Sequence, residues 1–294
     1  MTRRLFRPVL DRSGRASALK IVVLILLLVP AAWLATRWIA ADLGPRAFTE
    51  LNHQTGLWTI RFAFLALAVT PFRIIARWPK LIQVRRMIGV AAALYAIAHL
   101  LAYAADQAFD LDKVASEITG RVYLIIGFAA LIGLVLLLIT STDGMMRRLG
   151  GRRWRLLHRL AYVIGALGVV HFVMQSKLDV GQATYMAGFF FWLMGFRLLD
   201  ARFGERGRVP LWNILALVPL SGLLTMAGEA LYFWLHNGVD PGRILLANLS
   251  LEAGVRPGWI VIAAAGTVAL MGFFRRERSL PTERRVLARG VAAE

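Results

Sequence analysis

Three histidines lie inside apolar stretches long enough to cross a membrane: His99, His158 and His171. Ionisable side chains are costly inside a membrane and therefore point to function. At a rise of about 1.5 Å per residue, counted from Arg86 and Arg155, His99 and His171 lie roughly 20 and 24 Å above the inner boundary, and His158 roughly 5 Å. Two imidazoles at one depth on two helices can supply both axial ligands of a haem. His158 would belong to a second level near the inner face.

The interval between His158 and His171 is thirteen residues. At about 100° per residue, an ideal helix would put the two side chains roughly 140° apart, so they would not share one face. We therefore expect either that the helix deviates, for example around Gly165 and Gly168, or that the two histidines face different sides.

A second haem with two histidine ligands would need a histidine about 14 residues before His99, at the depth of His158. The sequence has Arg85 there. Spacing alone therefore predicts one outer haem and leaves the inner site open. The alternative for each histidine is hydrogen-bonded packing within a helix bundle, or a place in a proton path.

The composition indicates a membrane protein. Of the 294 residues, 58% are hydrophobic, against about 45–50% in soluble domains, and 35 basic and 17 acidic residues give a net charge of +18. The charge comes in short clusters between apolar runs, which does not favour a nucleic-acid partner. Cysteine is absent, which excludes disulfides, thiolate zinc sites, cysteine-bound iron–sulfur clusters and a cysteine nucleophile.

Eight apolar runs can each cross about 30 Å of hydrocarbon. We expect an all-α, polytopic membrane helix bundle, with six helices in a haem core and two more at the C-terminal side. The first run is expected to be a retained signal-anchor helix, since it is long and lacks a small-residue cleavage site. The runs are 19–39, 57–76, 87–105, 121–141, 155–174, 183–200, 210–235 and 258–274.

The distribution of charge predicts the orientation of these spans. With a cytoplasmic N-terminus, the inner segments hold 27 basic and 7 acidic residues, and the outer segments hold 8 basic and 10 acidic ones. Basic residues concentrate on the cytoplasmic side of membrane proteins. We therefore expect both termini to be cytoplasmic.

The spans suggest four segments. We expect a cytoplasmic N-terminal segment at 1–18, a haem-binding core of six helices at 19–200, two further helices with an outer loop at 201–274, and a cytoplasmic tail at 275–294. The stretch 200–210, with Gly204 and Gly207, is the expected hinge between the core and the two further helices.

An ordered set of short motifs over roughly residues 20–200 resembles the MsrQ family, formerly YedZ. These proteins are haem-binding membrane subunits of a periplasmic protein-methionine-sulfoxide reductase system, within the wider ferric reductase and NADPH oxidase transmembrane superfamily. The motifs are Thr70-Pro71-Phe72-Arg73, Arg85-Arg86-Met87-Ile88-Gly89, Tyr95 with His99-Leu100 and Tyr103, Thr140-Ser141, the run from Gly151 to His158 with Tyr162, and His171 with Lys177.

The resemblance implies a b-type haem, FMN, a bacterial inner-membrane location and a periplasmic partner reductase that contains molybdopterin. It also implies His99, His158 and His171 as axial ligands of haem iron, and the thirteen-residue interval is one familiar from the superfamily. Arg85 stands where a fourth histidine would be, which leaves the number of haems, one or two, open.

Four further residues are candidates for cofactor binding. Arg86, Trp154 and Arg155 cluster at the inner edge, where a flavin phosphate or a quinone headgroup could approach. Topology alone explains the arginines equally well, and anchoring at the membrane interface explains the tryptophan. His53, in the outer segment before the second span, is a candidate for shaping the outer haem edge or the docking surface, with a solvated loop histidine as the alternative.

These features predict a subunit that passes electrons outward to a periplasmic methionine sulfoxide reductase, where the substrate is reduced. No G-x-G-x-x-G stands between a strand and a helix pattern, so we expect electrons to come from quinol or a flavin reductase. The alternatives are a quinol-linked cytochrome b of another respiratory or ferric reductase complex, and a non-redox transporter that uses its histidines for protons. Glu229, inside the seventh span, needs a partner or a proton.

Overall fold

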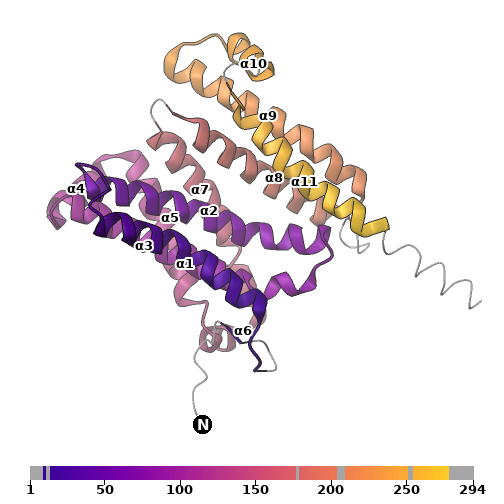
Figure 1. Ribbon diagram of the computed structural model, residues 1–294, viewed down its shortest axis with the longest axis horizontal. Coiled ribbons are helices and arrows are strands. Elements are labelled where there is room, and N and C mark those ends of the chain that lie inside the picture. The colour runs from indigo at the N-terminus through magenta and orange to yellow at the C-terminus, as the bar shows by residue number, and fades with distance from the viewer. Residues whose placement is uncertain (1–8, 11–13, 177–178, 204–208, 251–253, 278–294) are drawn as a thin grey trace, which may run out of the picture. The chain divides into compact units, whose positions relative to one another are not determined.

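The computed structural model describes residues 9–10, 14–176, 179–203, 209–250 and 254–277, which form an all-α protein (Figure 1). Within these residues, an isolated bridge between Leu10 and Ala16 is the only β pairing. The helices are α1 (Ala18–Ile39), α2 (Ala47–Ile75), α3 (Arg85–Asp106), α4 (Leu111–Gly120), α5 (Val122–Ile139), α6 (Asp143–Leu157), α7 (Leu160–Gln175), α8 (Gly181–Phe203), α9 (Leu211–Asn237), α10 (Pro241–Leu249) and α11 (Pro257–Glu277), with a 3-10 helix η1 (Pro79–Gln83).

Most of the expected membrane spans are present as long apolar helices. In the described part of the chain, six helices are long and apolar enough to cross a membrane, namely α1, α2, α3, α5, α9 and α11. The bent pair of α6 and α7 gives a seventh candidate. The expected span at 183–200 is helical, as α8, but it is not among these candidates, and its C-terminal part carries Arg197, Asp200 and Arg202. The expected polytopic helical fold is confirmed.

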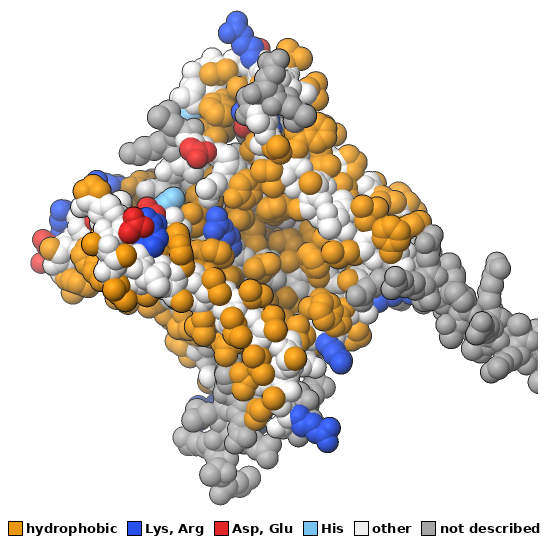
Figure 2. Space-filling view, in the orientation of Figure 1, with side chains coloured by type: hydrophobic (Ala, Val, Ile, Leu, Met, Phe, Trp, Pro, Cys, Tyr) orange, Lys and Arg blue, Asp and Glu red, His pale blue; other side chains and the backbone are white. Residues whose placement is uncertain are grey.

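The surface is that of a protein surrounded by lipid. Hydrophobic side chains cover most of the face seen in Figure 2. On α1, for example, Ile25, Leu26 and Leu28 are more than half exposed. Such exposure is unfavourable in water, but it is expected of a helix that faces hydrocarbon.

The helices form two compact units, and all three histidines singled out above belong to the first. This unit contains α1, α2 up to Val69, and α3 to α7. The second contains the end of α2 from Thr70, the start of η1 up to Leu81, and α8 to α11. The last helix of the expected core, α8, thus groups with the C-terminal helices. The expected segments 19–200, 201–274 and 275–294 describe function, and their boundaries stay predictions.

The core of the first unit is built where α3, α5 and α7 meet. Ala93 of α3, Ala130 and Leu134 of α5, and Ile164 of α7 form one buried cluster. Small residues allow such close packing of helices inside a membrane. Figure 1 shows α4 and α6 at opposite ends of this unit, and α3 contacts both, through Tyr103 with Glu117 of α4 and through Arg86 with Asp143 of α6.

The chain bends by 46° between α6 and α7. His158 follows the last residue of α6 as its C-cap, and Leu160 begins α7. The predicted deviation is therefore real, but it lies at His158 and Arg159 and not around Gly165 and Gly168, which are inside the unbroken α7. Because His158 and His171 lie on different helices, the angle calculated for one ideal helix does not apply to them.

In the second unit, the acidic residue of the seventh span has partners. Glu229 of α9 is 3% exposed. Its carboxylate accepts hydrogen bonds from Asn248 Nδ2 of α10 at 2.9 Å and pairs with Arg256 Nη2 at 2.9 Å. The ring nitrogen of Trp259 in turn donates to the Asn248 carbonyl at 2.7 Å. Glu229 therefore ties α9 to α10 and to the start of α11.

Several expectations concern residues outside those that the structure describes. They include most of the N-terminal basic segment, at 1–8 and 11–13, and Lys177. The hinge residues 204–208 and the tail residues 278–294 also lie outside the described residues.

Candidate functional site

The two histidines predicted to share the outer level come together in space. His99 of α3 and His171 of α7 have ring centroids 6.4 Å apart, with the ring planes crossed at 77°. They are 72 positions apart in the sequence, so the pair is made by the packing of α3, α5 and α7 described above.

Each ring of this pair is oriented by a carbonyl on a neighbouring helix. His99 Nδ1 donates to the Asn52 carbonyl of α2 at 2.7 Å, and His171 Nδ1 donates to the Tyr123 carbonyl of α5 at 2.8 Å. Because a carbonyl oxygen can only accept, each Nδ1 must carry the proton. Each Nε2 then keeps its lone pair, which is the state in which an imidazole binds a metal.

The pair fits a haem iron with two axial imidazoles. An imidazole nitrogen binds a first-row metal at about 2 Å, which puts the centroids of two opposed axial rings roughly 6 Å apart. The observed 6.4 Å agrees with this distance. The crossed planes are compatible too, since the axial bond lies in the plane of each ring and leaves the angle between the rings free.

Within the described residues, no group of three or more His, Asp or Glu side chains gathers into a metal site. A hexacoordinate haem needs only two ligands from the protein, because the macrocycle supplies the other four. The two imidazoles of His99 and His171 would therefore suffice to hold a haem, whereas a tetrahedral zinc site would need more ligands.

His53 lies near the outer pair but its side chain points to solvent. The residue is exposed and falls within α2, which begins at Ala47. The expectation of a loop before the second span was wrong here, since the helix extends outward by almost three turns beyond the apolar run. This extension brings the Asn52 carbonyl to His99.

Acidic residues from the end of α3 through α4 take part in local contacts. Asp110 caps α4 by accepting from the Lys113 backbone amide. Glu117 accepts from the Tyr103 hydroxyl at 2.6 Å and pairs with Arg121. Asp106 accepts from Thr49 at 2.8 Å. These contacts hold the outer end of the first unit together.

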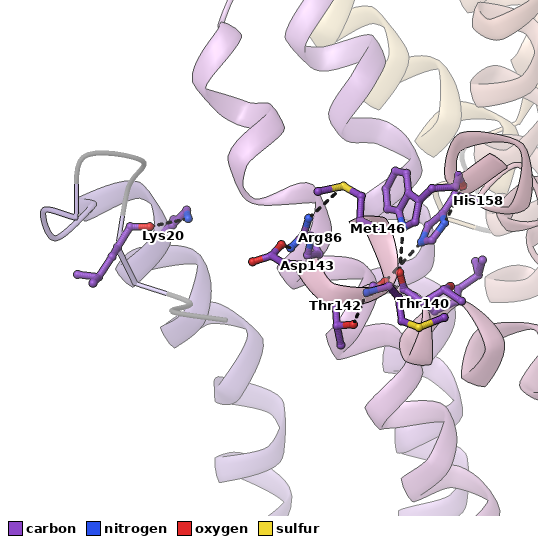
Figure 3. Close-up of polar contacts among 12 residues, drawn as sticks. Lys20, Arg86, Thr140, Thr142, Asp143, Met146 and His158 are labelled. Carbon is purple, nitrogen blue, oxygen red and sulfur yellow. Dashed lines mark hydrogen bonds and ion pairs between the residues drawn. The ribbon is translucent and has the colours of Figure 1, made fainter. Parts of the chain in front are cut away.

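The inner histidine is surrounded differently. Trp154 stacks on His158 with ring centroids 3.8 Å apart, and its own ring nitrogen donates to the Thr140 carbonyl at 2.8 Å. His158 Nδ1 donates to the Trp154 carbonyl of the same helix at 3.1 Å. Ser141 Oγ lies 3.4 Å from Nε2, and its proton goes to the Leu137 carbonyl. Figure 3 shows His158 beside Thr140.

Arg86 is paired and lies at the start of α3. Its guanidinium forms an ion pair with Asp143, the first residue of α6, and contacts the Met146 sulfur at 3.8 Å (Figure 3). This pair fastens α6 to α3 beside His158. The structure therefore gives Arg86 a structural contact, and its role in cofactor binding stays a prediction.

Arg155 lines a shallow hollow on the surface of α6 and the following turn. Arg152, Leu156 and Arg159 complete its lining. Leu156 is 64% exposed, so the hollow combines guanidinium groups with an apolar side chain at the inner end of the unit. An anionic group with an apolar attachment is the chemistry that such a lining suits.

Sequence reasoning missed the groups that orient the outer histidines. These are backbone carbonyls, of Asn52 and Tyr123, and a carbonyl carries no signature in the residue type. A signal was nevertheless present: each carbonyl is followed four residues later by a glycine within an apolar helix, at Gly56 and Gly127.

Comparison with known proteins identifies the family. Residues 14–169 match the family described as ferric reductase like transmembrane component. Proteins named protein-methionine-sulfoxide reductase heme-binding subunit MsrQ are similar to this chain. The one from Rhodospirillum rubrum is 39% identical over 202 residues, which cover 68% of this chain and 95% of that protein.

Two further relatives carry the same name. The protein from Polaromonas naphthalenivorans is 36% identical over 195 residues, covering 65% of this chain and 89% of its own length. The protein from Xanthomonas euvesicatoria is 42% identical over 157 residues, covering 53% and 72%. No solved structure matches this chain. The chain belongs to the MsrQ family of ferric reductase-like transmembrane proteins.

Proposed function

We propose that this chain is a membrane electron-transfer subunit that holds a b-type haem between His99 and His171. The observation that carries the proposal is the pair of rings 6.4 Å apart, each with Nδ1 bound to a carbonyl and Nε2 left as a ligand. The name of the relatives, heme-binding subunit, supports the same cofactor. His99 and His171 would hold the haem iron, and the group so held would supply one-electron transfer within the membrane.

The acceptor in this proposal is a periplasmic methionine sulfoxide reductase that contains molybdopterin and repairs oxidised proteins. The relatives' name supports a partnership with a protein-methionine-sulfoxide reductase. The orientation expected from the charges supports an outer position for it, since the outer segments contain most of the acidic residues and the inner ones most of the basic residues. In this proposal the chain lies in the bacterial inner membrane, with both termini in the cytoplasm.

We assign the inner level to the entry of electrons from quinol or a flavin reductase. If His158 Nδ1 donates to the Trp154 carbonyl, Nε2 keeps its lone pair, and the contact of Nε2 with Ser141 Oγ is long, at 3.4 Å. This nitrogen could therefore bind a haem iron or accept a hydrogen bond from a cofactor. The stacked Trp154 and the hollow lined by Arg155 suit a planar ring with a phosphate, as in FMN. His158 as the ligand of a second haem belongs to the same proposal, with the second axial ligand not assigned.

The direct test is an optical spectrum of the purified protein, oxidised and then reduced with dithionite, with haem and flavin quantified on the same sample. The wild-type protein should show the sharp α-band of a six-coordinate b-type haem. His99→Ala and His171→Ala should each lose that band. His236→Ala is the matched control, because His236 also has its Nδ1 bound to a helix carbonyl and an aromatic ring stacked on it, but lies on α9 in the second unit.

The outcome separates this proposal from the two alternative functions. Retention of the full band in both His99→Ala and His171→Ala would show that these residues are not the ligands. A colourless wild-type protein would favour a transporter. A quinol-linked cytochrome b would have the same band, and is distinguished by whether a periplasmic methionine sulfoxide reductase co-purifies and reoxidises the haem.

A further inference from the structure

Two glycines lie directly against the two outer histidine rings. A Cβ atom placed on Gly56 of α2 would be 2.9 Å from His99 Cε1 and 3.0 Å from its Nδ1. A Cβ atom on Gly127 of α5 would be 2.7 Å from both Cε1 and Nδ1 of His171. Such distances are too short for a carbon contact, so any larger residue at either position must displace the ring.

The two arrangements follow the same pattern, although they come from different helix pairs. Gly56 lies four residues after Asn52, whose carbonyl binds His99 Nδ1, and Gly127 lies four residues after Tyr123, whose carbonyl binds His171 Nδ1. Residues four apart lie on one face of a helix, one turn from each other. Each ring therefore lies over a glycine and reaches the carbonyl one turn away.

Other glycines in the same unit do not show this arrangement. Gly89, on the helix that carries His99, and Gly168, on the helix that carries His171, have nothing within 4 Å of an added Cβ. A Cβ atom on Gly133, also on α5, would lie 2.7 Å from Ile164 Cγ1, which is equally short but involves an aliphatic side chain that packs α7 against α5. Only Gly56 and Gly127, among the described glycines, would contact a histidine ring.

We propose that Gly56 and Gly127 are positioning residues for the two axial histidines. Without a side chain, each lets its ring come close enough to the helix for Nδ1 to donate to the carbonyl, and this bond fixes the tautomer and turns Nε2 toward the metal position. Glycine weakens a helix relative to alanine, so its presence inside two apolar helices is explained by this contact. The inference rests on the proposed haem site.

The test compares Gly56→Ala and Gly127→Ala with Gly89→Ala, Gly168→Ala and Gly133→Ala in the full-length protein. The readouts are haem per protein and the fraction of low-spin iron, measured by electron paramagnetic resonance. Loss of a group that orients a metal ligand lowers metal affinity about 10- to 100-fold. We expect Gly56→Ala and Gly127→Ala to lose haem to that degree and to show high-spin iron in the haem that remains. The three controls should keep the low-spin signal.

Two double variants test the contact between the added methyl group and the histidine ring, and this test does not depend on bound haem. If the added methyl group strikes the ring, removal of the ring should relieve the strain. The yield of membrane-inserted protein lost in Gly56→Ala should therefore return in Gly56→Ala/His99→Ala, and likewise for Gly127→Ala/His171→Ala. Because the measured quantity is the yield of membrane-inserted protein, the comparison can be made even if Gly56→Ala or Gly127→Ala gives little protein.

Three outcomes overturn the inference. They are a wild-type low-spin signal in both Gly56→Ala and Gly127→Ala, a loss in Gly133→Ala as large as that in Gly127→Ala, and a yield that the second substitution does not restore. If the positioning variants match wild type while His99→Ala and His171→Ala lose haem, the inference fails and the proposed function stands. If wild type itself holds no haem, the proposed function fails.

Discussion

The outer and inner histidines of the first unit are oriented by different means. At the outer level, His99 and His171 each bind a carbonyl on another helix, so α2, α3, α5 and α7 together fix the two rings. At the inner level, His158 binds a carbonyl of its own helix and caps that helix at a 46° bend.

The difference shows how one residue type is adapted to two tasks. Rings held by four packed helices cannot turn without a change in the packing, which suits a ligand pair that must keep its geometry as iron changes oxidation state. A ring at a helix end, covered by Trp154, can adjust when the turn changes. We therefore regard the outer pair as preorganised and the inner histidine as adaptable.

The largest effect is expected from His171→Ala. This variant removes one of two ligands from a rigid site, so the low-spin haem should be lost. Because the space left has the size of an imidazole, free imidazole added to the buffer should restore the low-spin spectrum. The α-band, titrated with imidazole, measures this. Absence of any recovery in a protein that still binds haem would mean that His171 does not ligate the iron.

His158→Ala should leave the outer level intact. The outer rings share no hydrogen bond with His158, so the low-spin signal of the outer haem should keep the wild-type shape, while flavin or a second haem per protein falls. Haem and flavin quantitation on the same sample checks this. Loss of the outer signal in this variant would mean that the two levels are not independent.

A smaller effect is expected from Ser141→Ala. The Ser141 hydroxyl donates to the Leu137 carbonyl and only approaches His158 Nε2, at 3.4 Å. Its removal should change the content of the inner cofactor by less than about threefold, since a contact of this length is weak. Cofactor content measured beside His158→Ala gives the comparison. If Ser141→Ala lowered the content of the inner cofactor as much as His158→Ala does, Ser141 would be essential for the inner site. The inner ring would then not be adaptable.

The smallest effect is expected from Arg86→Gln. The pair of Arg86 and Asp143 is partly exposed, with 27% and 46% of the side chains accessible. Such pairs contribute about 0.2–1 kcal/mol. A double-mutant cycle with Asp143→Asn, followed by thermal unfolding in detergent, should give a coupling in that range and no change in the outer haem spectrum. A coupling of several kcal/mol would make the ion pair a major stabilising contact. A loss of flavin in Arg86→Gln would instead support the predicted part of Arg86 in cofactor binding.

The sequence predicted the helical fold and the shared depth of His99 and His171, because apolar runs and a constant rise per residue are visible without tertiary structure. It offered a deviation of the helix as one of two possibilities, but it did not locate the break at His158. The two parts of the bent span differ in type: α6 is basic and amphipathic, and α7 is apolar. The expected span at 155–174 began at Arg155, so it included the boundary between α6 and α7 without showing it.

Other features depend on tertiary contacts and could not be derived from residue types. The carbonyls of Asn52 and Tyr123 bind the histidines only because α2 and α5 pack beside α3 and α7. The grouping of α8 with α9 to α11 has the same origin, since its position in the chain also suits the expected core. The partners of Glu229 come from α10 and the start of α11, which the sequence suggested only as an outer loop.

The most direct test of the account is the electron paramagnetic resonance spectrum of the oxidised full-length protein and of its three histidine variants. We predict a low-spin signal of an iron with two imidazole ligands in wild type, its persistence in His158→Ala, and its loss in both His99→Ala and His171→Ala. The reverse pattern, with the signal lost in His158→Ala and retained when either outer histidine is replaced, would contradict the assignment of the haem to the outer pair.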